Sequence, residues 1–293
     1  MNIIEEPSIL SLAFPARQRI IVVSDSLAER VLVELRRTPE LPEGDEQDDS
    51  GVVDRVRGAM RRKVDDAVAH LVQAVISLRK SATDIRIISD TQSQGLSFPP
   101  GHPARSVLYI AHPVALGQYY PAATFHRLVV EHKFAEAMDL IMELGAQSIN
   151  IEQLRGYKKN DLFEIISAIP GVRIGGKSGR ETETQSSITV EAELEGTGQA
   201  RIPDDSSWLK HEPMWMKLAE NRMEGRLRKF SLAVRHLDSM CIDKSLETEI
   251  KKFGFRVGGN FKEHEEVIWR LSGEFPPLEQ LATERLLQKG GGI

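Results

Sequence analysis

The stretch PGVRIGGKSGRE, at residues 170–181, has the composition of a loop that binds phosphate. Its residues Gly171, Gly176, Lys177 and Ser178 match the pattern G-x-x-x-x-G-K-[ST]. In such a loop, backbone N–H groups and the first turn of the next helix bind the phosphates, lysine neutralises their charge, and serine binds magnesium. Under this interpretation Gly176, Lys177 and Ser178 are the phosphate-binding residues.

The sequence after Ser178 lacks the helix that such a loop requires. Residues 179–187 read GRETETQSS, without an apolar residue, and from Ile188 onward apolar residues alternate with polar ones. A segment without an apolar stripe could not pack as a helix on a sheet, and Pro170 before the glycines is typical of a turn. We therefore predict a turn or hairpin here, and we keep phosphate binding as an alternative.

Histidines form a second group of candidate residues, because four of the eight lie between residues 102 and 132. His112 follows a predicted strand, where sheet proteins often place site residues, whereas His126 and His132 belong to a predicted helix. Imidazole and carboxyl groups can serve as general acids and bases. The catalytic candidates of this alternative are His112, His126, Glu131 and His132, in an enzyme that acts on a nucleotide or another phosphate-containing substrate.

No recognisable set of metal ligands or nucleophile residues accompanies these histidines. The sequence contains no H-E-x-x-H, G-x-S-x-G or G-x-G-x-x-G motif, so no metal site and no cofactor is predicted. Cys241 and His236 could form a nucleophile pair, but the surrounding sequence gives no sign of an oxyanion hole. A basic group after residue 221 is interpreted as a solvated strand end, with phosphate contact as the alternative. It consists of Arg222, Arg226, Arg228 and Lys229.

Composition restricts the class of protein. Apolar residues make up 41% and charged residues 28% of the 293 positions, as in ordinary globular chains. The net charge of −5 and the 6% of aromatic residues argue against sequence-specific nucleic-acid binding. One cysteine cannot form a disulfide within the chain or a cysteine-based metal site. The N-terminus lacks the basic segment of a signal peptide, and no apolar stretch reaches the roughly 18 residues of a transmembrane span, so we expect a cytoplasmic protein.

Residues 1–146 predict a mixed α/β lobe. Runs rich in isoleucine and valine predict strands, and apolar residues at helical spacing predict helices between and after them. The strands expected are 17–25, 84–90 and 104–113, and the helices are 26–37, 53–80 and 123–145. A strand, helices and a second strand in succession predict a partly parallel sheet. Prolines, glycines and a run of acidic residues predict a mobile acidic loop at 39–54.

Residues 147–293 predict a second lobe, largely antiparallel, with covering helices. At 187–195 apolar and polar residues alternate strictly, which indicates a strand with one buried and one solvated face. Further strands are expected at 147–154, 228–238 and 265–275, and helices at 243–254 and 278–288. Together the two lobes predict the α+β class.

These observations favour a non-enzymatic interaction or effector subunit of a multi-component system, in contact with a protein partner or with a second copy of itself. The acidic loop and the long helix 53–80 offer contact surface for such a role. An enzyme that uses the histidines or the Gly171–Ser178 loop is one alternative. A membrane-acting protein that inserts the β-hairpin containing residues 187–195 is another.

Overall fold

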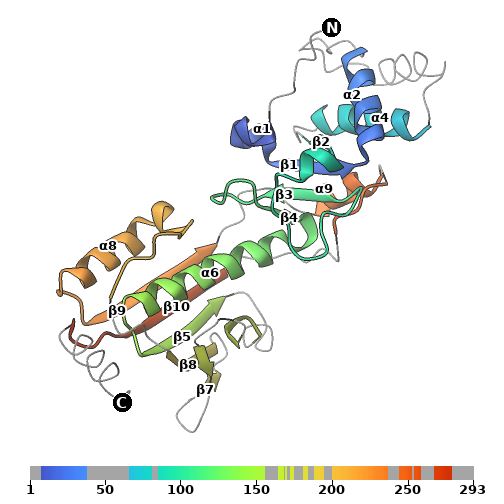
Figure 1. Cartoon of the computed structure of the whole chain (residues 1–293). Coiled ribbons are helices and arrows are strands. Elements are labelled where there is room, and N and C mark those ends of the chain that lie inside the picture. Colours follow the sequence, from blue (N-terminus) through green and yellow to red (C-terminus); the bar gives the residue numbers. More distant parts are fainter. Residues whose placement is uncertain are drawn as a thin grey trace, which may run out of the picture. The chain divides into compact units, whose positions relative to one another are not determined.

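The computed structural model of the chain contains helices and two mainly antiparallel sheets, which confirms the α+β class (Figure 1). It describes residues 8–37, 66–80, 85–155, 164–167, 169, 172–174, 181–183, 188–194, 200–236, 244–252, 254–258 and 267–278. The predicted acidic loop at 39–54, the first part of the predicted helix 53–80 and most of the predicted helix 278–288 lie outside these residues. Contacts divide the chain into two compact units, Met1–Phe125 with Ile242–Lys262 and His126–Cys241 with Glu263–Ile293.

The first unit contains a four-stranded sheet in the order β2-β1-β3-β4. Its strands are β1 (Arg19–Val23), β2 (Arg86–Ser89), β3 (Leu108–Ala111) and β4 (Tyr119–Pro121). Strands β1 and β2 are parallel, with Val23 opposite Ser89, whereas β1 with β3 and β3 with β4 are antiparallel pairs. A parallel pair requires a crossover connection, and the partly parallel sheet predicted from the sequence is confirmed.

Helices α2 (Asp25–Arg37) and α4 (Asp66–Lys80) belong to the crossover between β1 and β2. They contact each other, and α2 also contacts β2. The apolar face of α2 includes Val31, which is fully buried. Because side chains alternate along a strand, Ile21 and Val23 of β1 point to the helical face of the sheet.

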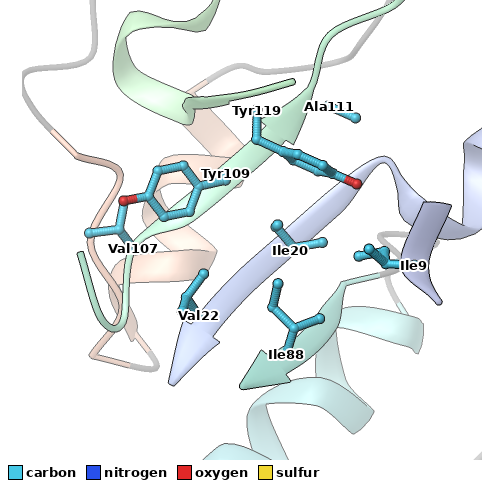
Figure 2. Close-up of a cluster of buried hydrophobic side chains, with 8 residues drawn as sticks. All are labelled: Ile9, Ile20, Val22, Ile88, Val107, Tyr109, Ala111 and Tyr119. Carbon is cyan, nitrogen blue, oxygen red and sulfur yellow. The ribbon is translucent and has the colours of Figure 1, made fainter. Parts of the chain in front are cut away.

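The opposite face of this sheet is covered by short segments. Ile20, Val22 and Ile88 form a buried cluster there with Tyr109 and Tyr119 (Figure 2). The side chains packed against this cluster come from the N-terminal segment and from the loop after β2: Leu10, Leu12, Phe14, Leu96, Phe98 and Ala104. The short helices of the unit are η1 (Ile9–Ser11), α1 (Phe14–Arg17), α5 (Asp90–Ser93), η2 (Ala122–Thr124) and α9 (Lys244–Lys252).

The second unit contains an antiparallel sheet in the order β6-β8-β5-β10-β9, with β7 also paired to β8. Its strands are β5 (Ser148–Arg155), β6 (Val172–Ile174), β7 (Glu181–Glu183), β8 (Ile188–Leu194), β9 (Lys229–His236) and β10 (Val267–Glu274). In β8, Val190, Ala192 and Leu194 are buried whereas Glu191 and Glu193 are exposed. The alternation predicted for this segment is confirmed, and β8 lies inside the sheet with strands on both sides.

Helix α6 (Phe125–Glu143) packs on this second sheet, and the ring of Phe134 lies edge-on to that of Trp269, with 4.1 Å between centroids. Gly145 follows the helix with a φ of 88°, in the left-handed region that a glycine commonly adopts at the end of a helix. Helices η3 (Leu209–His211) and α8 (Pro213–Met223) also belong to this unit. Within the described ranges, none of the helices combines the length and the apolar character that a membrane span requires.

The division into compact units follows packing and not position along the chain, as two segments show. Helix α6, apart from Phe125, belongs to the second unit because its buried face packs on the second sheet. The segment 254–258 belongs to the first unit, where the Arg256 carbonyl accepts a 2.8 Å hydrogen bond from the Leu108 N–H. Periodicity in the sequence identifies each element, but it does not say on which sheet the element packs.

Candidate functional site

His112, the first of the predicted catalytic residues, follows β3 in the first unit and is fully buried. Its Nδ1 accepts hydrogen bonds from the backbone N–H groups of Val114 (3.2 Å) and Ala115 (2.9 Å). Its ring lies edge-on to that of Tyr120, with 5.8 Å between centroids. A ring nitrogen that accepts two backbone bonds carries no proton, so this nitrogen holds the turn after β3 and is not placed to serve a substrate.

The other three predicted catalytic residues lie on α6 in the second unit, on different sides of the helix. Successive helical residues are rotated by about 100°, so Glu131 and the adjacent His132 do not face each other. His126 is buried and precedes His132 by six residues, which corresponds to a rotation of about 240°. Burial raises the pKa of Glu131, and Arg127 opposes this effect. The helix therefore does not bring His126, Glu131 and His132 to one face.

His132 pairs instead with Glu136, one helical turn later, with 3.1 Å between Nε2 and Oε1. The carboxylate of Glu136 also accepts hydrogen bonds from the hydroxyl of Ser206 (2.5 Å) and from the N–H groups of Ser207 (3.1 Å) and Trp208 (2.8 Å). Here the serine contacts the carboxylate and not the imidazole, so this histidine is not placed as a base for the hydroxyl. These contacts attach the segment that leads into η3 to α6.

Lys133 makes a second attachment between α6 and its surroundings. Its buried ammonium pairs with Glu212 and donates a 2.8 Å hydrogen bond to the carbonyl oxygen of Arg235. The same group lies 4.6 Å from the ring centroid of Trp208, within the range of a cation–π contact. The polar residues at the centre of α6 thus have structural partners.

The predicted phosphate-binding residues Gly176, Lys177 and Ser178 lie outside the described residues, as does Cys241. Strand β6 precedes them and strand β7 follows them, and both strands pair with β8. Because the chain is extended at Glu181–Glu183, a helix that begins near Lys177 does not continue through those positions. Both strands run antiparallel to β8 and pair with successive stretches of it, β6 with residues 192–194 and β7 with residues 188–190. The chain therefore keeps its direction from β6 to β7, and these two strands do not form a hairpin with each other. The turn predicted at the glycines lies outside the described residues and stays a prediction.

The carboxyl ends of β1 and β2 form a site that was not selected from the sequence. After β1 the chain enters α2, which lies on the helical face of the sheet. After β2 the chain passes to the opposite face, where Leu96 and Phe98 pack against the buried cluster. Neighbouring parallel strands whose connections leave toward opposite faces define a topological switch point, and open α/β sheets bind ligands at this position.

Three charged residues meet at this switch point, and we call Asp25, Asp90 and Arg105 the strand-end site. The Oδ1 of Asp25, beyond β1, accepts a 3.0 Å hydrogen bond from the N–H of Thr91, beyond β2. The Nε and Nη2 of Arg105 donate to the Oδ2 of Asp90 at 3.0 and 2.5 Å. Asp25 therefore links the two strand ends, and Asp90 holds the guanidinium at the same edge.

The backbone of the loop before β3 fixes the position of Arg105. The next residue, Ser106, has a φ of 61°, in a left-handed region that serine seldom adopts. Its N–H donates to the carbonyl of Val22 (2.9 Å), and its carbonyl accepts from the N–H of Arg256 (2.8 Å). The guanidinium of Arg256 also donates to the Arg105 carbonyl at 2.8 Å. Residues held in unfavourable backbone conformations by several bonds are concentrated at functional sites.

The charges of the strand-end site stabilise one another. A hydrogen bond from the Thr91 backbone lowers the pKa of Asp25, and the side chains of Ser89 and Thr91 lower it further. The hydrogen bond to Asp90 raises the pKa of Arg105, and the negative charges of Asp90 and Asp25 raise it further. These shifts favour the charged forms of Asp25 and Arg105 at this edge of the unit.

These groups match the chemistry of phosphate and of the cations that accompany it. Guanidinium binds phosphate through two parallel hydrogen bonds, and the N-terminal N–H groups of a helix such as α2, which begins at Asp25, also favour anions. Magnesium is commonly held by one or two carboxylates together with phosphate oxygens. Across the described part of the chain, no group of three or more His, Cys, Asp or Glu residues could hold a metal ion by itself.

The sequence does carry one signal for this site. Both strands end in the dipeptide Ser-Asp, as Ser24-Asp25 and as Ser89-Asp90. The repetition becomes informative only when the two strands are known to be parallel neighbours, because the carboxyl ends of such strands lie at one edge of the sheet. Arg105 has no comparable local signal, since a loop brings it to this edge.

Comparisons of the chain with protein-family models, with curated proteins and with solved structures found no match.

Proposed function

We propose that the first unit binds a phosphate-containing small molecule, of the class of nucleotides, at the strand-end site. The observation that carries this proposal is the position of Arg105, Asp25 and Asp90 at the switch point between β1 and β2, where α/β sheets bind ligands. The exposed guanidinium of Arg105 supplies the phosphate contact, and the N-terminus of α2 adds to it. The carboxylates accept hydrogen bonds from sugar hydroxyls or hold a cation.

A calorimetric titration tests this proposal directly. The full chain is titrated with ATP, AMP, pyrophosphate and adenosine in the presence of magnesium, and the phosphate-containing compounds are expected to bind more tightly than adenosine. Arg105→Gln should weaken their binding about tenfold or more, because charge-assisted hydrogen bonds to phosphate are lost. Failure of every phosphate-containing compound to bind the wild-type chain would refute the proposal, and so would equal affinity in Arg105→Gln.

Arg226→Gln is the matched control for this experiment. Arg226 is an exposed arginine of the second unit, paired with Glu224 at 3.1 Å. Its substitution removes the same charge and leaves the strand-end site unchanged. Affinity should therefore equal that of the wild type, whereas a loss in both variants would indicate only a nonspecific effect of net charge.

The roles inferred from the sequence stay predictions, in addition to the nucleotide binding proposed above. A unit that binds a nucleotide is compatible with an interaction or effector subunit, because a ligand can regulate contact with a partner. The enzymatic alternative through His112, His126, Glu131 and His132 and the membrane-acting alternative through residues 187–195 also stay predictions, as does the cytoplasmic location. Self-association or a protein partner is best tested by light scattering of the purified chain, with and without ATP.

A further inference from the structure

We infer that the first unit binds to an anionic lipid surface, through the edge of its sheet opposite to the strand-end site. The parallel strands β1 and β2 begin at this edge, and the antiparallel strand β3 ends there, with Ile110 opposite Arg19. Two segments meet at this edge: residues 8–17, which precede β1, and the loop 112–118 between β3 and β4. This inference does not depend on the phosphate site proposed above.

Direct contacts join the two segments into one surface. A Cβ atom at Gly117 would lie 3.3 Å from the Cδ2 of Leu10. The hydroxyl of Tyr119 donates a 2.8 Å hydrogen bond to the carbonyl oxygen of Arg17. Tyr119 also shares the buried cluster with Ile9 (Figure 2). Side chains of both segments are therefore presented together at this edge.

The loop 112–118 exposes a large apolar side chain, since Leu116 is 65% exposed. Backbone hydrogen bonds hold this loop in place. The Nδ1 of His112 accepts the bonds from Val114 and Ala115 described above, and the N–H of His112 donates to the carbonyl oxygen of Gln118 at 2.8 Å. Single exposed leucines are common, but a leucine on a loop that is already ordered can enter a lipid surface without a further loss of loop entropy.

The two segments carry no charged residue. Residues 7–16 and 106–125 contain no Asp, Glu, Lys or Arg, in a chain with 43 acidic residues and a net charge of −5. The one histidine among them, His112, is buried. These segments therefore add no charge that would repel an anionic surface, and apolar side chains of this kind are what the boundary between headgroups and acyl chains accepts.

Two arginines border these segments and supply an electrostatic attraction. Arg86, at the start of β2, is exposed, and its Nε donates a 3.4 Å hydrogen bond to the carbonyl oxygen of Ala16. The guanidinium of Arg17 lies 5.1 Å from the ring centroid of Phe14. Within the residues that the structure describes, neither arginine is paired with a carboxylate. Both positive charges are thus available to the phosphates of a lipid surface.

This combination of groups favours lipid over other polyanions. Nucleic acid would contact the arginines through its phosphates, but it would gain nothing from an exposed leucine on an uncharged loop. A lipid surface uses both, because its headgroups attract the arginines and its apolar boundary takes up Leu116. The strand-end site lies at the carboxyl ends of β1 and β2, so binding at their amino ends leaves that site open.

Sedimentation with lipid vesicles tests this inference. The full chain is mixed with vesicles of phosphatidylcholine alone, or of equal parts phosphatidylcholine and phosphatidylserine, and the bound fraction is measured in the pellet. The wild type should bind the vesicles that contain phosphatidylserine and not those of phosphatidylcholine alone, and added salt should weaken this binding. Failure to bind the vesicles with phosphatidylserine would refute the inference.

Matched substitutions separate the apolar contribution from the charged one. Leu116→Ser should weaken binding about tenfold, because the inserted side chain is lost. Arg86→Gln should weaken it about fivefold, the scale of one basic residue at an anionic leaflet. Met214→Ser and Arg226→Gln are the controls: Met214 is 74% exposed, and both residues belong to α8 or the segment after it in the second unit. Both controls should bind as the wild type does, and circular dichroism verifies that each variant is folded.

Two results of this series would overturn the inference. Equal losses in Leu116→Ser and Met214→Ser would mean that any exposed apolar side chain adheres to the vesicles. Normal binding of Leu116→Ser together with weakened binding of Arg86→Gln would indicate a general polyanion surface instead of a lipid site. Leu116→Trp gives an independent readout, because lipid brominated in its acyl chains should quench the added fluorescence. The added fluorescence of Met214→Trp should not be quenched, and equal quenching in the two variants would contradict insertion at Leu116.

Discussion

The ammonium of Lys133, in the middle of α6, donates a 2.8 Å hydrogen bond to the backbone carbonyl oxygen of Arg235 in β9. The same ammonium pairs with Glu212 and lies 4.6 and 5.9 Å from the ring centroids of Trp208 and Trp215. Through this one buried ammonium, α6 is connected to the edge strand β9 and to the segment that contains η3 and the start of α8. A buried charge is stable only when such partners compensate it, so loss of Lys133 would leave its partners without their donor.

Lys133→Met should lower the free energy of unfolding of the second unit by about 2–3 kcal/mol, because Glu212 and the Arg235 carbonyl lose their buried donor. The three tryptophans of the chain, Trp208, Trp215 and Trp269, all belong to the second unit. Urea unfolding followed by tryptophan fluorescence therefore reports this unit alone.

Lys217→Met is the control for this substitution. Lys217 is exposed on α8 and pairs with Glu220 at 3.1 Å, so its replacement should change the free energy of unfolding by less than about 0.5 kcal/mol. Equal urea midpoints for the two methionine variants would contradict a structural role for Lys133.

Glu136 should make the second unit sensitive to acid. Burial opposes ionisation of its carboxyl group, but hydrogen bonds from His132, Ser206, Trp208 and Ser207 outweigh burial and lower its pKa from 4.5 to about 2. Because the folded-state pKa is the lower one, the carboxylate stabilises the fold above pH 4.5, and this contribution is lost as the pH falls from 4.5 through 2. The shift corresponds to about 3 kcal/mol at neutral pH.

Glu136→Gln should therefore destabilise the second unit at neutral pH, and the difference from the wild type should shrink by about 2 kcal/mol between pH 7 and pH 3. Tryptophan fluorescence in urea at several pH values measures this difference. If the gap between the two proteins is the same at pH 7 and pH 3, another group is responsible for the acid sensitivity.

The ionised carboxyl group of Asp139, three residues after Glu136 on the same helix, should have the opposite effect on stability. Burial raises its pKa, and the neighbouring carboxylates of Glu136 and Glu143 raise it further. An acid with a raised folded-state pKa destabilises the fold when ionised, so Asp139→Asn should stabilise the second unit at pH 7. Asp139 lies at the exposed surface of the helix, so its desolvation by neighbouring atoms is only partial, and screening by water limits the gain to about 0.3–0.5 kcal/mol. The gain should disappear at low pH, and a loss of stability at pH 7 would contradict the assignment.

The fold and the site differ in how far the sequence could predict them. Alternation of apolar residues identified β8 and isoleucine-rich runs identified β1 and β2, because burial of one face leaves its period in the sequence. The histidines of α6 were grouped by their nearness along the chain, and helical rotation separates them. Arg105 reaches the strand-end site through a loop and an ion pair with Asp90. Such contacts between distant residues leave no period to detect.

A substitution at Gly258 tests the assignment of residues 254–258 to the first unit. Its φ of 82° is unfavourable for any other residue, and a Cβ atom here would lie 2.6 Å from the Cβ of Pro121 and 3.1 Å from the Cγ1 of Val107. Gly258→Ala should therefore destabilise the first unit by about 2 kcal/mol or more. Gly95→Ala is the matched control, because a Cβ atom there meets no atom within 4 Å, and it should change stability by less than about 0.5 kcal/mol.

Hydrogen exchange of β3 is the suitable measurement for this pair, since the tryptophans report only the second unit. The Leu108 N–H at the start of β3 donates to the Arg256 carbonyl, two residues before Gly258. A loss of about 2 kcal/mol should accelerate exchange of β3 amides about thirtyfold in Gly258→Ala relative to Gly95→Ala. Equal protection of β3 in the two variants would mean that the segment 254–258 does not pack on β3 and β4. In that case the backbone around Arg105 would also lose its support from Arg256.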